Sequence, residues 1–219
     1  LIDPIPQDPS LTKQLIPESL RTSWGLLRSN TKRISVFCYP GAPLRKWLED
    51  LSTLGEDFDI LLTYGHAQLL GSFSGQQTSL PNHLHLLSIP FVSQDEYDWV
   101  LSQCDFNIVR GEDSFVRAQL AGKPFLWHIY PQEDLAHEAK LAAFLDLYLE
   151  TANQELRLAA IAAMTWAMPS QWIFSLDDWS THALTWRSQL LKTQGDGGLA
   201  ARLLRFVGQT QAIKRCGRL

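Results

Sequence analysis

The sequence predicts an α/β protein built on a parallel β-sheet that carries helices on both faces. Several short, almost continuous apolar runs are typical of strands buried on both faces. Helical patterns separate most of these runs, and strands that alternate with helices at this spacing favour a parallel sheet. The chain has 219 residues, of which 45% are hydrophobic and 19% charged. It is therefore long enough to bury a substantial core.

The elements follow one another in a regular order. Residues 1–33 are proline-rich and weakly periodic, which is typical of a linker or interdomain segment. The strands are predicted at 34–39, 58–64, 84–91, 106–109 and 124–130. Helices are predicted at 44–54, 95–103, 114–120, 133–150, 154–168, 177–192 and 199–212. The sheet and its helices thus define a predicted domain over residues 34–219.

Net charge, cysteine content and hydropathy limit the classes of protein to which the chain can belong. The net charge of −4 supplies no basic surface for a nucleic acid. Cys38, Cys104 and Cys216 fit no ligand spacing, so we expect reduced thiols in a cytoplasmic protein. The uncharged stretch 158–176 is broken by Pro169 and is too short to span a membrane, so we expect a buried helix there. The chain begins without methionine or a signal-peptide pattern and is interpreted as part of a longer protein.

The residues with the most distinctive chemistry follow predicted strands. Ligands of parallel α/β sheets bind beyond the carboxyl ends of the strands, where loops and helix N-termini converge. Tyr39 and Pro40 follow the first strand, and residues 91–94 follow the third. The fourth strand is followed by Arg110-Gly-Glu-Asp-Ser. We therefore expect these three segments to meet at one edge of the sheet.

The segment Arg110-Gly-Glu-Asp-Ser has the composition of a phosphate site. A helix predicted to start near Ser114 places Asp113 and Ser114 at its N-cap and first turn, where backbone N–H groups and the helix dipole attract anions. Arg110 can grip phosphate oxygens in a fork, and Glu112 can accept hydrogen bonds from two ribose hydroxyls. The alternative is that Asp113 or Ser114 only caps the helix.

Aromatic residues on the same edge suggest a site for a planar base. Phe91 and Tyr97 could hold a base between them, and Gln94 could bind the base or a phosphate. Phe37 and Tyr39 are two residues apart on a strand end and share one face. For each of these residues taken singly, a place in the core or on a solvated surface is the alternative.

Other chemistries lack the residues they need. His83 and His85 have no third ligand in register, and His128 lies inside a predicted strand, so we expect no metal site. The sequence contains no GxSxG, P-loop or GxGxxG motif. Nucleophilic catalysis and P-loop chemistry are therefore not expected.

The segment RGEDSFVRAQLAGKPFLWHIYPQEDLAHEAKLAAFL (110–145), with VFCYP (36–40) and SIPFVSQDEYD (88–98), resembles the protein-arginine rhamnosyltransferases that modify bacterial elongation factor P. The similarity runs from about Ile34 into the C-terminal helices. It implies a Rossmann-like fold, namely the C-terminal domain of a GT-B glycosyltransferase, in which two such domains face each other across a cleft.

The resemblance implies a reaction and a set of roles. Such an enzyme transfers rhamnose from TDP-β-L-rhamnose to one arginine of elongation factor P, with inversion and without a metal or other cofactor. Glu112 and Arg110 would be the catalytic residues of this chain, with Arg110 neutralising the leaving diphosphate. The donor would be held by Phe37, Tyr39, Phe91, Gln94, Tyr97, Glu112, Asp113 and Ser114.

The chain also departs from the family pattern. The N-terminal domain, which carries the catalytic aspartates of the family, is absent, so this chain is expected to be the donor-binding half. Leu120 stands where a bulkier aromatic residue is expected, which should affect packing only. Two alternatives stay open: another GT-B nucleotide-sugar transferase, and a nucleotide-binding module without catalytic activity.

Overall fold

The computed structural model describes residues 22–26, 31–63, 81–167 and 175–194. At its centre lies a five-stranded sheet in the order β3-β2-β1-β4-β5, and every neighbouring pair is parallel. The predicted Rossmann-like parallel sheet is therefore confirmed. The strands are β1 (Lys32–Val36), β2 (Phe58–Leu62), β3 (Leu84–Ser88), β4 (Phe106–Arg110) and β5 (Phe125–His128).

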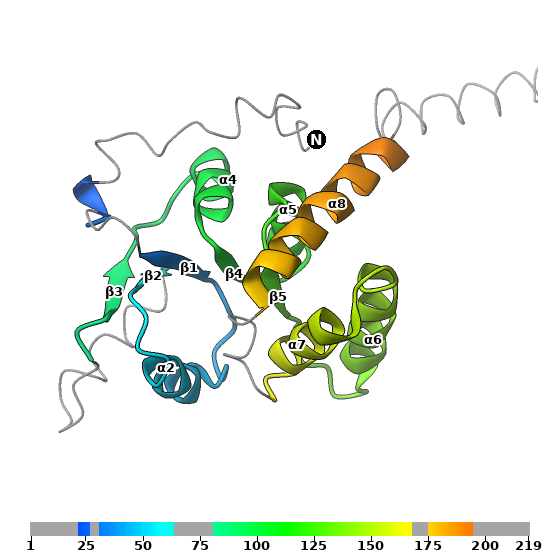
Figure 1. Ribbon diagram of the computed structural model, residues 1–219, viewed down its shortest axis with the longest axis horizontal. Helices are drawn as coiled ribbons and strands as arrows, with labels where there is room; N and C mark the ends of the chain where they lie inside the picture. Colours follow the sequence, from blue (N-terminus) through cyan, green and yellow to red (C-terminus); the bar gives the residue numbers. More distant parts are fainter. Residues whose placement is uncertain (1–21, 27–30, 64–80, 168–174, 195–219) are drawn as a thin grey trace, which may run out of the picture.

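Helices cover both faces of the sheet. Figure 1 shows α4 and α5 on one side and α2 on the other. Helix α8 packs against α5, and α7 packs against β5. The helices are α2 (Leu44–Ser52), α4 (Gln94–Gln103), α5 (Asp113–Ala121), α6 (Ala136–Tyr148), α7 (Gln154–Met164) and α8 (Leu176–Gln194).

The strands end earlier than several of the apolar runs. β1 ends at Val36 instead of residue 39, β2 at Leu62 and β3 at Ser88. The residues that follow are no longer strand, yet Cys38 and Ile89 are almost fully buried, and the Ile89 N–H still donates to the Leu62 carbonyl of β2. Hydrophobicity alone cannot separate a strand from a buried loop that continues it.

The core is built around the central strands. All five residues of β2 are buried, as expected for a strand covered on both faces. A second buried cluster contains Trp24 and Leu26, together with side chains of β2, β3 and α4. Both residues belong to the segment 1–33 predicted as a linker, of which the structure describes residues 22–26 and 31–33. At least this part of the segment packs on the domain.

The prediction of a buried helix in the uncharged stretch 158–176 is confirmed in part: α7 is helical and buried on one face, but it is shorter and more exposed than expected. Helix α7 ends at Met164, and Leu158 is 62% exposed. Leu156 and Ala160 face the core, whereas Leu158 lies on the other side of the helix. Residues 168–174 and the helix predicted at 199–212 lie outside the described residues. Among the described helices, none has the length and apolar character needed to cross a bilayer.

Candidate ligand-binding site

A pocket of about 360 Å³ lies at the carboxyl edge of the sheet. Four connections of the chain meet there because the carboxyl ends of parallel strands share one edge. The ends of β1 and β2 contribute Phe37 and Thr63. The other lining residues come from the β3–α4 and β4–α5 connections and from the first turns of the helices: Pro90, Phe91, Val92, Ser93, Gln94, Tyr97, Arg110, Asp113 and Arg117.

The N-terminus of α4 is fixed by a capping box. The Ser93 hydroxyl accepts a hydrogen bond from the Glu96 backbone N–H at 3.3 Å, and the Glu96 carboxylate accepts one from the Ser93 backbone N–H at 2.7 Å. This reciprocal pair satisfies two N–H groups that the helix itself leaves open. The backbone hydrogen bond from Ser93 also lowers the pKa of Glu96. Ser93 thus both starts α4 and lines the pocket.

The turn between β4 and α5 requires glycine. Gly111 has φ +64°, which is strained for any residue with a Cβ, and an added Cβ would meet the Tyr39 hydroxyl at 3.4 Å. The indole N–H of Trp127 donates to the Gly111 carbonyl at 3.1 Å. This turn brings Arg110 and the first residues of α5 to the pocket.

Neither Asp113 nor Ser114 caps α5. The N-cap position is Glu112, and no side chain there accepts a hydrogen bond from the helix. The Ser114 hydroxyl instead donates to the carbonyl of Arg110, and its side chain is buried. The alternative that Asp113 or Ser114 serves only as a cap is therefore not supported by the geometry.

Aromatic rings hold Arg110 in position. Its guanidinium carbon lies 4.2 Å from the centre of the Phe37 ring and 5.0 Å from that of Tyr39. Nη1 also donates to the Cys38 carbonyl at 3.2 Å. Cation–π contacts of this kind contribute about 0.5–2 kcal/mol each. The two aromatic residues expected beside the ligand therefore also orient the cation that lines the pocket.

Tyr97 brings a buried polar atom to the pocket wall. Its ring packs edge-on against Phe37, with ring centres 5.8 Å apart. Its hydroxyl is buried and has no hydrogen-bond partner among the described residues, and burial raises its pKa. Phe91, by contrast, is 86% exposed although it lines the pocket.

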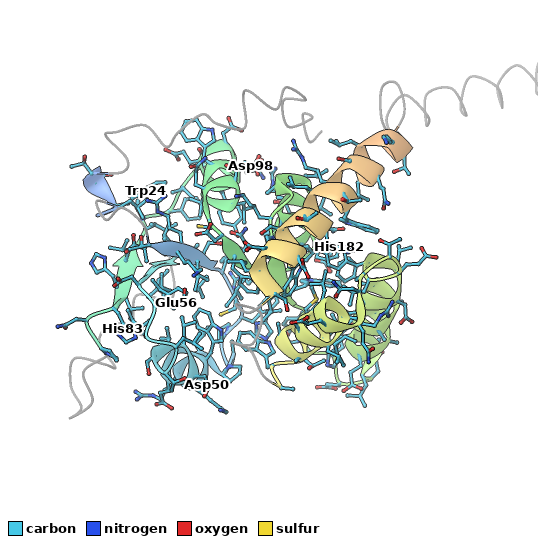
Figure 2. The ribbon with its side chains drawn as sticks, viewed as in Figure 1. Trp24, Asp50, Glu56, His83, Asp98 and His182 are labelled. Carbon is cyan, nitrogen blue, oxygen red and sulfur yellow. The ribbon has the colours of Figure 1, made fainter. Side chains whose placement is uncertain are left out.

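A buried arginine connects the two helices beside the pocket. The Arg117 side chain is 7% exposed, and its Nε donates to Asp113 Oδ2 at 2.9 Å. Its Nη1 donates to Oδ2 of Asp98 on α4 at 2.8 Å; Figure 2 labels Asp98 on that helix. Desolvation raises the pKa of Asp98, while the hydrogen bond and the charge of Arg117 lower it less strongly.

The structure brings most of the predicted site residues together. Those that line the pocket are Phe37, Phe91, Gln94, Tyr97, Arg110 and Asp113. Those that lie beside it, in the same connections, are Tyr39, Glu112 and Ser114. Their roles in binding remain predictions. Leu120 is buried in α5. Among the described residues, no group of three or more His, Cys, Asp or Glu side chains could hold a metal ion.

Sequence reasoning missed Thr63 and Arg117. Thr63 was expected inside a strand, but it is the first residue after β2. A signal for Arg117 was present, since Asp113 lies four residues earlier, the spacing of a helical ion pair. The contact with Asp98 joins two helices and leaves no local pattern in the sequence.

The arrangement is that of a Rossmann-like α/β domain, with a pocket at the carboxyl edge of a parallel sheet beside an arginine and helix N-termini. The family described as Elongation-Factor P (EF-P) rhamnosyltransferase EarP matches residues 8–208. The chain belongs to this family.

Individual relatives agree with this assignment. The chain is 44% identical over 124 residues to a protein-arginine rhamnosyltransferase of Pseudomonas putida, which covers 52% of this chain and 32% of the relative. A protein of the same name from Pseudomonas aeruginosa is 42% identical over 134 residues, which cover 58% of this chain and 36% of the relative. The matched part thus spans about a third of these relatives.

A solved structure shows the same fold. It was determined as the structural basis for EarP-mediated arginine glycosylation of translation elongation factor EF-P. It matches this chain with a TM-score of 0.72 and 30% identity, and the match covers 93% of this chain and 67% of that one.

Proposed function

We propose that this chain is the donor-binding half of an inverting glycosyltransferase that moves rhamnose from TDP-β-L-rhamnose to an arginine of elongation factor P. Membership of the family and the names of the relatives support the reaction. The observation that carries the donor-binding role is the pocket at the carboxyl edge of the sheet, where Arg110 is held between an aromatic ring and a backbone carbonyl.

The chemistry explains what each half must supply. The guanidinium of an acceptor arginine is a poor nucleophile because its lone pairs are delocalised and it stays protonated, with a pKa above about 12. A carboxylate must orient it and take a proton as the bond to the sugar forms. The diphosphate that leaves needs positive potential at its own end of the cleft. The donor half is responsible for the second task.

The described residues suit that task. Arg110 lines the pocket with its guanidinium fixed, and the N-termini of α4 and α5 contribute their dipoles at the same edge. Together they would stabilise the departing diphosphate without a metal ion. The thymine base of the donor would lie between Phe91 and Tyr97 near Gln94. The ribose would lie beside Glu112. Asp113 and the first turn of α5, including Ser114, would hold the phosphates.

The proton-accepting carboxylate belongs to the other half of the enzyme in this proposal. Glu112 is exposed at the N-cap of α5, where it is better placed for a ribose than for an acceptor arginine. The catalytic aspartates of the family would face Glu112 across the cleft between the two domains.

The donor-binding role is tested by thermal unfolding with TDP. A ligand at about 100 times its dissociation constant should stabilise the fold by about 2.7 kcal/mol. Arg110→Met should reduce this stabilisation strongly, because it removes the cation from the pocket. Lys46→Met is the matched control: it also deletes one positive charge, but from an exposed ion pair with Asp50 on α2. Absence of any TDP effect on the unaltered protein would refute the donor site.

The identity of the nucleobase is tested by comparing the binding affinities of TDP and UDP. The aromatic side chains Phe91 and Tyr97 should favour the extra methyl group of thymine by about 1 kcal/mol. Isothermal titration should therefore show about fivefold tighter binding of TDP. Equal affinities would indicate another nucleotide-sugar transferase. Binding of both nucleotides without transfer by the complete two-domain enzyme would indicate a non-catalytic module.

A further inference from the structure

Arg117 is the most deeply buried charged side chain of the pocket. It lies one turn into α5, and its side chain is 7% exposed, compared with 57% for its partner Asp113 and 21% for Asp98. Nε is bound to Asp113 and Nη1 to Asp98. With both bonds made, the plane of the guanidinium is fixed between α4 and α5.

The guanidinium of Arg117 has a third nitrogen, Nη2. Nη2 has no hydrogen-bond partner among the described residues, and Arg117 lines the pocket. The charge balance at the site depends on this side chain. Without Arg117, the two negative charges of Asp98 and Asp113 would exceed the single positive charge of Arg110. This excess is unfavourable for binding an anionic ligand.

We infer that Arg117 is a positioning residue that fixes Asp113 and offsets the two carboxylates, so that the pocket accepts a diphosphate. The inference rests on the proposed donor-binding function and adds a residue to it. Arg117 acts through the charge and orientation of its neighbours.

Stabilisation of the fold alone is a weak explanation for this network. Buried ion pairs often contribute little net stability, because desolvation of the charges offsets their attraction. Asp98 shows this cost: its Oδ1 is buried and has no hydrogen-bond partner among the described residues. A purely structural contact between α4 and α5 could be made by apolar side chains, whereas the charge of Arg117 affects what the pocket binds.

The test compares ligands with and without phosphate. Titration calorimetry measures TDP affinity, and NMR titration measures thymidine affinity, for the unaltered protein and for Arg117→Met. We expect TDP affinity to fall at least about tenfold, as for loss of a charged hydrogen-bonding group. Thymidine affinity should change less than about threefold. Arg117→Lys keeps the charge and should leave the ratio of the two affinities close to that of the unaltered protein, even if the Met variant does not fold.

A second substitution separates charge from packing. Asp98→Asn added to Arg117→Met removes one of the two carboxylates left without Arg117, and it should recover part of the TDP affinity. Equal losses for TDP and thymidine in Arg117→Met, or unchanged TDP affinity, would overturn the inference while the proposed function stands. An unaltered protein that does not bind TDP would overturn both. Lys46→Met again controls for the change in net charge.

Discussion

Ser114 shows how a site residue can act through its neighbour. Its hydroxyl donates to the carbonyl of Arg110, so it fixes the backbone from which the pocket arginine extends. We expect Ser114→Ala to reduce the free energy of unfolding by about 1 kcal/mol, because a partly buried carbonyl loses its donor. The same change should weaken TDP binding by about 1–2 kcal/mol. Urea unfolding and isothermal titration measure the two effects, and unchanged TDP affinity would remove Ser114 from the site.

Cys38 lies beside the pocket cation but should be chemically inert. Burial raises the pKa of its thiol to about 12, although the charge of Arg110 lowers it slightly. The thiol is protonated below this pKa, so at pH 8 about one molecule in ten thousand carries the reactive thiolate. In a Cys216→Ser variant, the buried Cys38 and Cys104 should not react with a disulfide reagent at pH 8 until the protein is unfolded. Rapid labelling of the folded protein would contradict this expectation.

The residues of the site were predictable to the extent that they are encoded locally. Arg110 ends β4 and Asp113 begins the helix that follows it, so their place on the edge of the sheet could be inferred from the sequence. The roles of Tyr39 and Ser114 in holding Arg110 could not, because they depend on the turn at Gly111 and on contacts between separate strands. Arg117 was missed because its contact with Asp98 joins two separate helices.

At the scale of the element, the start of α4 can be tested by its capping box. Ser93→Ala removes the acceptor for the Glu96 N–H and should cost about 1 kcal/mol of stability. Glu96→Gln is the matched control, because glutamine can complete the same box. Chemical denaturation of the two variants should therefore rank Ser93→Ala as the less stable. The reverse order would show that the cap does not hold the helix.

The same capping box predicts that the stability of the fold depends on pH. The folded-state pKa of Glu96 is lowered, so its ionised carboxylate stabilises the fold above the ordinary carboxyl pKa. This contribution to stability is lost as the pH falls through the folded-state pKa. Glu96→Gln does not titrate and should show a smaller loss of stability in this acidic range. An identical pH profile for both proteins would argue against the hydrogen bonds from Ser93.

Element positions were predicted better than element ends. Every strand of the sheet was expected at its observed place, because continuous apolar runs are a strong signal for buried strands. The ends were displaced where apolar residues such as Cys38 continue into buried loops. Helix α7 was predicted too long, since the absence of charge in 158–176 does not show which residues face the core.

At the scale of the whole molecule, binding and transfer should be separable. The chain should bind TDP-rhamnose through its pocket but should transfer no sugar, because transfer needs a carboxylate within about 3 Å of the acceptor nitrogen and a facing domain that excludes water. Mass spectrometry of elongation factor P incubated with TDP-rhamnose provides the measurement. The control is the complete two-domain enzyme, which should add one rhamnose mass. A mass gain with this chain alone would show that the proton-accepting carboxylate lies within this chain.

The burial of Trp24 and Leu26 extends the packed domain beyond its sheet. Both side chains are at most 4% exposed and share a cluster with Leu61, Leu87 and Val100. The first hydrogen-bonded strand begins at Lys32, so a boundary drawn from the sheet alone would cut these side chains away. The cluster would then be open to water at two large apolar sites. The packed domain therefore extends upstream of its own sheet, and this extension is defined by side-chain packing.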